Sequence, residues 1–180
     1  MTYAPNGDLR DRIREQRENQ KYFPENVILR WFAQVVSAVA YLHSSGLVHR
    51  DIKPANVFLD ENDSALLGDF GIACPIGSTR KNRDRITVGT PMYMAPEIID
   101  GDDGDDKADI WSLGCLLYEM MQLKAPFSSS SLSKLLHYIL KNKYRKVYSE
   151  TYSSELIGTC LLKLRKLSLF ACLNYFLCFF

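Results

Sequence analysis

The chain has 180 residues, a formal net charge of +1, 24% charged residues and 47% hydrophobic residues, which suits one domain with a buried core. The absence of a basic excess argues against nucleic acid as a partner, and the polar first 22 residues do not have the pattern of a signal peptide. The five cysteines show neither CxxC spacing nor a histidine partner pattern, which argues against zinc and for reduced thiols in the cytosol or nucleus.

Two helices are predicted in the first quarter of the chain. Asp8 is suited to cap a mostly charged surface helix that runs roughly to Asn19. Pro24 suits the first position of a second helix, which ends at residues 45–46. This second helix is predicted to be amphipathic because its apolar residues recur at three- and four-residue steps: Ile28, Trp31, Phe32, Val35, Val39 and Leu42.

A small β-hairpin is predicted next. Two apolar runs at residues 57–59 and 65–67 flank a polar stretch of five residues, which indicates two strands and a loop. The hairpin would place Asn56 and Asp69 just outside its strands and close in space. The following segment, residues 72–91, has no periodicity and is predicted to be a mobile surface loop.

Further helices are predicted in the second half of the chain. One is apolar around much of its girth and should be buried, a shorter one runs from Leu132 to Ile139, and another opens at Ser153. The acidic run at residues 100–106 does not fit an EF-hand calcium loop, because Asp105 and Trp111 replace its glycine and glutamate, and it is expected to be a solvated loop. The apolar residues of the first of these helices, the one predicted to be buried, are Ile110, Leu113, Leu116, Leu117 and Met120.

Residues 162–180 form a divergent, mostly apolar tail. The apolar stretch after Ser168 is interrupted by Asn174 and is too short for a confident membrane span. We expect read-through into non-coding sequence or a mis-predicted gene end. A membrane or partner anchor and an unusual final helix are the alternatives.

The residues that carry chemistry lie at 49–56, which read His-Arg-Asp-Ile-Lys-Pro-Ala-Asn. Asp51 is an acidic group that can accept the proton of a hydroxyl, and Lys53 can neutralise charge on a transferred phosphoryl group. Asn56 and Asp69 offer the hard oxygen ligands that Mg²⁺ takes together with phosphate oxygens and water. Each residue alone could be a solvated charge or a satisfied core polar group, but the ordered set predicts phosphoryl transfer from ATP to a hydroxyl.

This octapeptide, Asp-Phe-Gly at 69–71 and Ala-Pro-Glu at 95–97 resemble the protein-kinase signature in order and spacing. The resemblance covers residues 3 to about 161 and implies the C-terminal lobe of a kinase at residues 1–161, mainly α-helical with a small β-hairpin. No Gly-x-Gly-x-x-Gly loop or Val-Ala-Ile-Lys-like strand precedes His49. We therefore expect the β-rich N-terminal lobe to be missing and the isolated chain to be weak or inactive.

The resemblance also implies roles for residues around the site. Phe58 would form part of the floor under adenine. His49 would pack on Phe70, which Gly71 follows in the Asp-Phe-Gly motif. Asp109 would accept backbone N–H groups near His49. Glu97 would correspond to a glutamate that an arginine holds in place in the family.

Regulation by phosphorylation is a further implication. Arg50 would bind a phosphate that an activating kinase places on the loop between the Asp-Phe-Gly and Ala-Pro-Glu motifs. Thr87 is the leading acceptor, with Ser78 and Thr79 behind it, although the family's commonest acceptor position is Ile86 in this chain. Thr90 would hydrogen-bond Asp51 and Lys53, which fits serine or threonine substrates.

Several short segments resemble the NIMA-related (Nek) kinases, above all Trp-Phe-Ala-Gln at 31–34 and Asn-Val-Phe-Leu at 56–59. The implied activity is ATP- and Mg²⁺-dependent phosphorylation of protein serine or threonine, in the cytoplasm, with cytoskeletal or nuclear association as variants. The rival interpretation is a non-catalytic lobe that docks substrates or a partner kinase. Intact Asp51, Asn56 and Asp69 argue against this rival, and the missing lobe argues for it.

Overall fold

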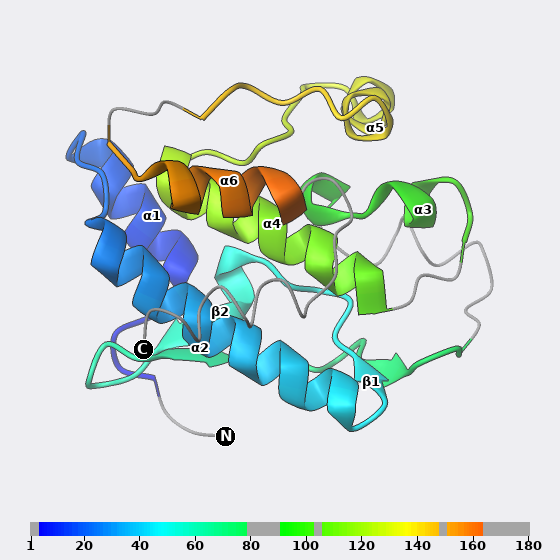
Figure 1. Ribbon diagram of the computed structural model, residues 1–180, viewed down its shortest axis with the longest axis horizontal. Coiled ribbons are helices and arrows are strands. Elements are labelled where there is room, and N and C mark those ends of the chain that lie inside the picture. The colour runs from blue at the N-terminus through cyan, green and yellow to red at the C-terminus, as the bar shows by residue number, and fades with distance from the viewer. Residues whose placement is uncertain (1–3, 79–90, 103–105, 148–150, 164–180) are drawn as a thin grey trace.

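The computed structural model describes residues 4–78, 91–102, 106–147 and 151–163, with side chains up to residue 160. The described part is mainly helical, as the sequence predicts, and has two small sheets, of which the sequence predicts one (Figure 1). Of the predicted apolar tail, only its first two residues fall in the described part, where they complete the last helix. The rest of the tail lies outside the described residues.

The first two helices match the predicted positions closely. Helix α1 spans Leu9–Glu18, and the Asp8 carboxylate caps it by accepting the Asp11 N–H at 2.9 Å. Helix α2 spans Glu25–Ser44. Pro24 is the residue before α2 and not its first residue, because its ψ of 142° is extended; that prediction was wrong by one position.

Helix α2 lays its apolar stripe on the core. Ile28, Phe32 and Val39 are fully buried, whereas Tyr41 is 73% exposed. By length and composition α2 could cross a membrane, but a core helix with such a stripe meets the same criterion. In this fold the buried face of α2 packs on the hairpin and on helix α4, Asp106–Gln122.

The predicted hairpin is present and is anchored on both sides. Strand β2, Val57–Leu59, pairs antiparallel with β3, Ala65–Leu67. On its other edge, β2 exchanges backbone hydrogen bonds with residues 6–7, at 2.9 and 3.2 Å. The N-terminal segment and the hairpin therefore form one unit, at the end of which Asn56 is held.

A second strand pair was not predicted. Strand β1, Leu47–Val48, pairs antiparallel with β4, Cys74–Pro75. The segment 72–91 is thus not entirely a loop, and that prediction was wrong at its beginning. Two-residue strands leave no periodicity to detect, and their pairing depends on the chain reversal between them.

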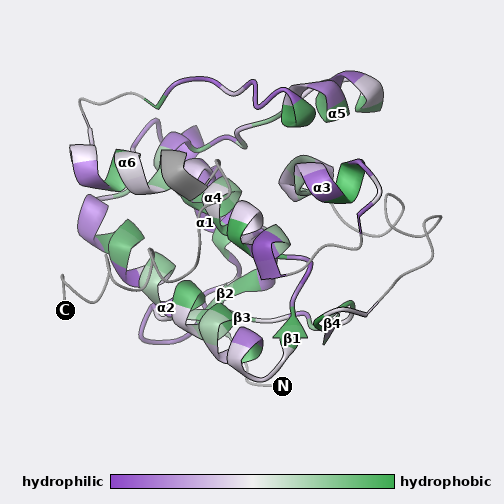
Figure 2. Cartoon of the chain, turned by 45° about the vertical axis from the view of Figure 1, so that its right-hand side comes forward, coloured by the Kyte–Doolittle hydropathy of each residue, from purple (hydrophilic) through white to green (hydrophobic). Residues whose placement is uncertain are grey.

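Helix α4 is the centre of the fold. It is buried along most of its length, as predicted, and packs against α2 on one side and α6, Ser154–Lys163, on the other (Figure 1). Figure 2 shows the apolar surfaces of these helices turned toward one another. Helices α3, Pro96–Ile99, and α5, Leu132–Leu140, pack together beside this layer. The 3₁₀ turns η1 and η2 span Pro54–Asn56 and Pro91–Tyr93.

One buried hydrogen bond ties η2 to α4 and predicts a pH effect. The Tyr93 hydroxyl donates to Glu119 at 2.5 Å, and burial raises the pKa of Glu119 above its ordinary value of 4.5, more than this bond lowers it. The unfolded chain therefore releases this proton at lower pH than the folded chain. Consequently, the free energy of unfolding should fall as pH rises from about 4.5 through the folded-state pKa.

The substitution Glu119→Gln removes this titration while keeping an acceptor for Tyr93. We expect it to raise the free energy of unfolding at neutral pH and to flatten its decline with pH. Urea unfolding across this pH range is the measurement. Glu61→Gln, in the exposed hairpin loop, is the control that should leave the slope unchanged, and an equal slope in Glu119→Gln and the parent chain would contradict the prediction.

Candidate functional site

The segment between β1 and η1 brings Asp51, Lys53 and Asn56 together. The Lys53 ammonium lies 2.6 Å from Asp51 Oδ2, and the Asn56 amide nitrogen donates to the same oxygen at 2.9 Å. The amide nitrogen also donates to the backbone carbonyl of Asp51 at 2.8 Å. The Asp51 side chain is 15% exposed. A carboxylate held by two donors, with part of its surface open, is fixed in place and can still accept a hydroxyl proton.

Asn56 and Asp69 occupy neighbouring positions, as the hairpin predicts. The Gly68 N–H donates to the Asn56 carbonyl at 2.9 Å, which ties the residue before Asp69 to the end of η1. Asp69 has a φ of 62°, in the left-handed region that aspartate adopts more readily than most residues. The Asn56 side-chain nitrogen donates to Asp51. The Asn56 side-chain oxygen and the exposed Asp69 carboxylate are the two groups suited to bind a hard cation.

A buried aspartate holds the loop that carries Asp51. Asp109 is fully buried on α4, and its carboxylate accepts the backbone N–H groups of His49 at 2.9 Å and Arg50 at 2.8 Å. The predicted contact is confirmed. Arg50 has a φ of 67°, a strained conformation for a side chain of this size that surrounding contacts must impose. Asp109 supplies such a contact.

The sequence analysis missed the third partner of Asp109. His43 Nε2 on α2 lies 2.8 Å from Asp109 Oδ2, and the His43 side chain is only 8% exposed. His43 joins α2 and α4 beneath the Asp51 loop. The sequence offers a signal, because His43 follows the apolar stripe of α2.

The aromatic contacts around the site agree with the resemblance. The His49 and Phe70 rings lie 5.2 Å apart, as predicted, and His49 Nε2 lies 3.1 Å from the Gly68 carbonyl. Gly71 N–H donates to Asp69 Oδ1 at 3.4 Å. Phe58, at the centre of β2, lies so close to Gly68 that an added Cβ there would meet its ring at 2.9 Å.

The regulatory residues are described only in part. Arg50 Nη2 donates to the Ser78 carbonyl at 3.2 Å, so this guanidinium reaches the segment after the Asp-Phe-Gly motif. Thr79, Thr87 and Thr90 lie outside the described residues. Glu97 lies half-buried in α3.

No group of three or more histidine, cysteine or acidic side chains that could enclose a metal ion occurs within the described ranges. The acidic run is described only at residues 100–102 and at Asp106, the first residue of α4. Asn56 and Asp69 would instead form a site with only two protein ligands. It suits a cation that keeps waters and takes further oxygens from a phosphate ligand.

Comparison with known proteins decides the family. The profile described as "Protein kinase domain" matches residues 1–165. The chain belongs to the protein kinase family. Within this kinase lobe, the predicted order of motifs corresponds to elements of the fold: the Asp51 loop between β1 and η1, the Asp-Phe-Gly motif after β3, and the Ala-Pro-Glu motif at the start of α3.

The relatives confirm the predicted resemblance to Nek kinases. The chain is 45% identical over 136 residues to "Serine/threonine-protein kinase Nek3" of Mus musculus, 41% over 160 residues to "Probable serine/threonine-protein kinase nek3" of Dictyostelium discoideum, and 40% over 156 residues to "Serine/threonine-protein kinase Nek1" of Mus musculus. These matches cover 76%, 87% and 87% of this chain, but 26%, 14% and 13% of the relatives. The chain thus corresponds to a limited part of each relative.

Proposed function

We propose that this lobe contributes the catalytic loop of a serine/threonine protein kinase that transfers the γ-phosphoryl group of ATP to protein hydroxyls. The observation that carries the proposal is the convergence of Lys53 and Asn56 on one oxygen of Asp51, at 2.6 and 2.9 Å. This triad places a proton acceptor, a cation and a metal-ligand amide within one short loop. Phosphoryl transfer requires chiefly such positioning and charge neutralisation.

The proposed reaction uses the residues as follows. The Asp51 carboxylate accepts a hydrogen bond from the substrate hydroxyl and turns its oxygen toward the γ-phosphorus. As the new oxygen–phosphorus bond forms, the bond from the γ-phosphorus to the β–γ bridging oxygen breaks and ADP leaves. The hydroxyl proton passes to Asp51, and the Lys53 ammonium offsets negative charge on the moving phosphoryl group.

Mg²⁺ fits the residues at hand. The Asn56 side-chain oxygen and the exposed Asp69 carboxylate would hold it, since Mg²⁺ takes one or two protein oxygens and fills its remaining positions with phosphate oxygens and water. When bound, the ion would neutralise phosphate charge. Phe58 is the residue we propose beneath adenine, and its ring lies in the space that a side chain at position 68 would need.

The activity of these 180 residues alone is expected to be low. The sequence contains no Gly-rich phosphate loop with its paired lysine and glutamate, and removal of even one preorganised group from a transition state costs on the order of 10²–10³-fold in rate. The alternative function is a non-catalytic lobe that docks other proteins. The intact triad favours catalysis.

An assay of the full-length polypeptide that contains these residues tests the proposal. With ATP and Mg²⁺, we expect phosphate to appear on serine and threonine of a generic protein substrate but not on tyrosine. The 180-residue chain, tested in parallel, should be slower by at least about 10²-fold. Phosphorylation that persists when Asp69→Ala removes the proposed metal ligand, or that falls mainly on tyrosine, would refute the assignment.

A further inference from the structure

A second concave site lies where the C-terminal end of α4, helix α5 and the segment after α5 meet. It encloses about 680 Å³ and shares no lining residue with the phosphoryl-transfer site. No aspartate or glutamate lines it. We call it the basic pocket, after the four cations in its lining: Lys124, Lys143, Arg145 and Lys146.

The charge around the basic pocket is one-sided. Six of the 22 lysine and arginine residues lie between residues 123 and 147, and this stretch contains no aspartate or glutamate, although the whole chain carries only +1. The four lining cations are exposed. In the described part of the chain, the ion pairs involve none of these four. An anionic group among them would relieve the repulsion between like charges.

The basic segment is held in place by aromatic contacts. The Tyr118 hydroxyl donates to the Arg145 carbonyl at 3.0 Å, and the Tyr144 ring packs edge-on against Tyr118 and Phe127, with centroids 6.2 and 6.1 Å apart. Phe127 stacks on Trp111 of α4. The backbone that presents Lys143 and Lys146 is therefore anchored to the core, which lowers the ordering cost of binding. Figure 2 shows the described chain that follows α5 coloured as hydrophilic.

We propose that the basic pocket docks an acidic peptide segment of another protein. A narrow extended chain can enter a hollow of this volume and bring carboxylates to cations on its walls, while the tyrosines supply hydroxyls and apolar edges. This inference uses none of the catalytic residues. It therefore stands or falls independently of the proposed kinase activity.

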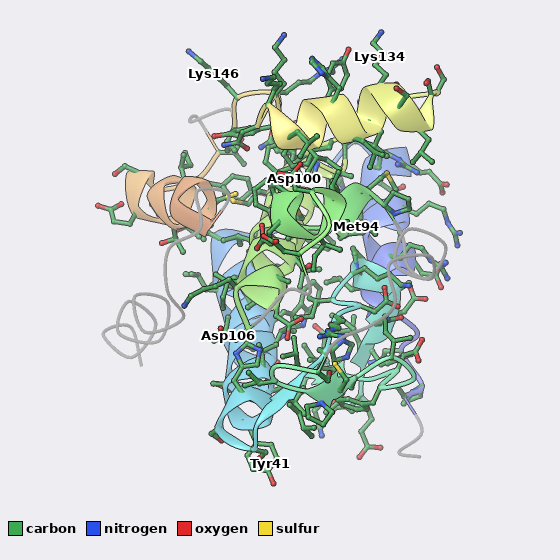
Figure 3. The ribbon with its side chains drawn as sticks, turned by 90° about the vertical axis from the view of Figure 1, so that its right-hand side faces the viewer. Tyr41, Met94, Asp100, Asp106, Lys134 and Lys146 are labelled. Atoms are coloured by element: carbon green, nitrogen blue, oxygen red, sulfur yellow. The ribbon has the colours of Figure 1, made fainter. Side chains whose placement is uncertain are left out.

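Two other anionic partners fit the pocket less well. Single-stranded RNA uses free aromatic faces for base stacking. The lining rings of Tyr22, Tyr118 and Tyr144 pack edge-on against other rings, and Lys134 lies over the ring of Tyr138, the fourth lining tyrosine. A lipid surface is flat, whereas these cations line a hollow. Figure 3 shows Lys134 and Lys146 projecting from the same edge of the molecule, but only Lys146 lines the pocket.

Binding without nucleotide tests the proposal. Fluorescence polarisation of a fluorescein-labelled peptide of alternating glutamate and serine would be measured with the full chain at physiological ionic strength. We expect Lys143→Glu/Lys146→Glu to raise Kd by about tenfold or more. The matched control, Lys134→Glu/Lys141→Glu, makes the same charge change in the same segment outside the pocket lining. It should change Kd by less than about threefold, because neither lysine lines the pocket and exposed charges that do not contact the peptide are screened by salt.

Three results would overturn the proposal. The first is equal weakening of peptide binding by the two double variants, and the second is no weakening of peptide binding by either. The third is failure of the peptide to bind while phosphatidylserine vesicles or oligouridine do bind. Should Lys143→Glu/Lys146→Glu fail to fold, amide NMR shifts of the parent chain on peptide titration replace it. Shifts concentrated at Lys124 and residues 143–146 support the docking site, and shifts elsewhere refute it.

Discussion

The substitution Asp51→Asn should lower the rate of phosphoryl transfer by about 10²–10⁴-fold in the full-length polypeptide, the range expected for loss of a positioned proton acceptor. Asparagine keeps the shape of the side chain and one oxygen that Lys53 and Asn56 can still contact, so the fold of the loop should survive. What is lost is the negative charge that accepts the hydroxyl proton. The measurement is kcat with saturating ATP and Mg²⁺.

The binding of ATP separates this effect from a structural one. Because Asp51 acts on the hydroxyl and Asn56 and Asp69 are the proposed metal ligands, the KM for ATP should stay within about threefold of the parent value while kcat falls. The exposed Asp100 provides a matched change, and Asp100→Asn should alter neither constant. A kcat for Asp51→Asn close to that of the parent protein would remove Asp51 from the catalytic role.

Much of the fold could be predicted because the main signals are local. Asp8 as a helix cap, the stripe from Ile28 to Val39, and the apolar runs on either side of a five-residue loop each fix an element from neighbouring residues. The motif predicted the separate roles of Asp51, Lys53 and Asn56, but the convergence of Lys53 and Asn56 on one oxygen of Asp51 became apparent only in the structure.

The missed features depend on residues that are far apart in the chain. The β1–β4 pair joins two-residue strands separated by the whole catalytic loop and hairpin, and the His43–Asp109 contact spans 66 residues. The basic pocket is likewise built from α4, α5 and Tyr22 near the start of the chain. Composition showed only a net charge near zero, which concealed the clustering of cations between residues 123 and 147.

The substitution Asp109→Ala should destabilise the lobe by about 3–5 kcal/mol. The buried carboxylate accepts two backbone N–H groups and contacts the buried His43, and each buried donor left without an acceptor costs about 1–3 kcal/mol. Asp109→Asn retains one oxygen and should show a smaller loss. The measurement is the free energy of unfolding in urea, monitored by circular dichroism.

The same substitution should act on function through the loop that Asp109 holds. Arg50 keeps its positive φ because its N–H is fixed to this carboxylate, so without Asp109 the backbone can relax and carry Asp51 away from Lys53. The Asp109→Ala protein that remains folded should therefore show a reduced kcat even below its unfolding temperature. Asp100→Ala, which removes an exposed carboxylate, should stay within about 0.5 kcal/mol of the parent chain. A loss of stability below about 1 kcal/mol for Asp109→Ala would mean that other contacts hold the loop. Those contacts would then also have to impose the positive φ of Arg50.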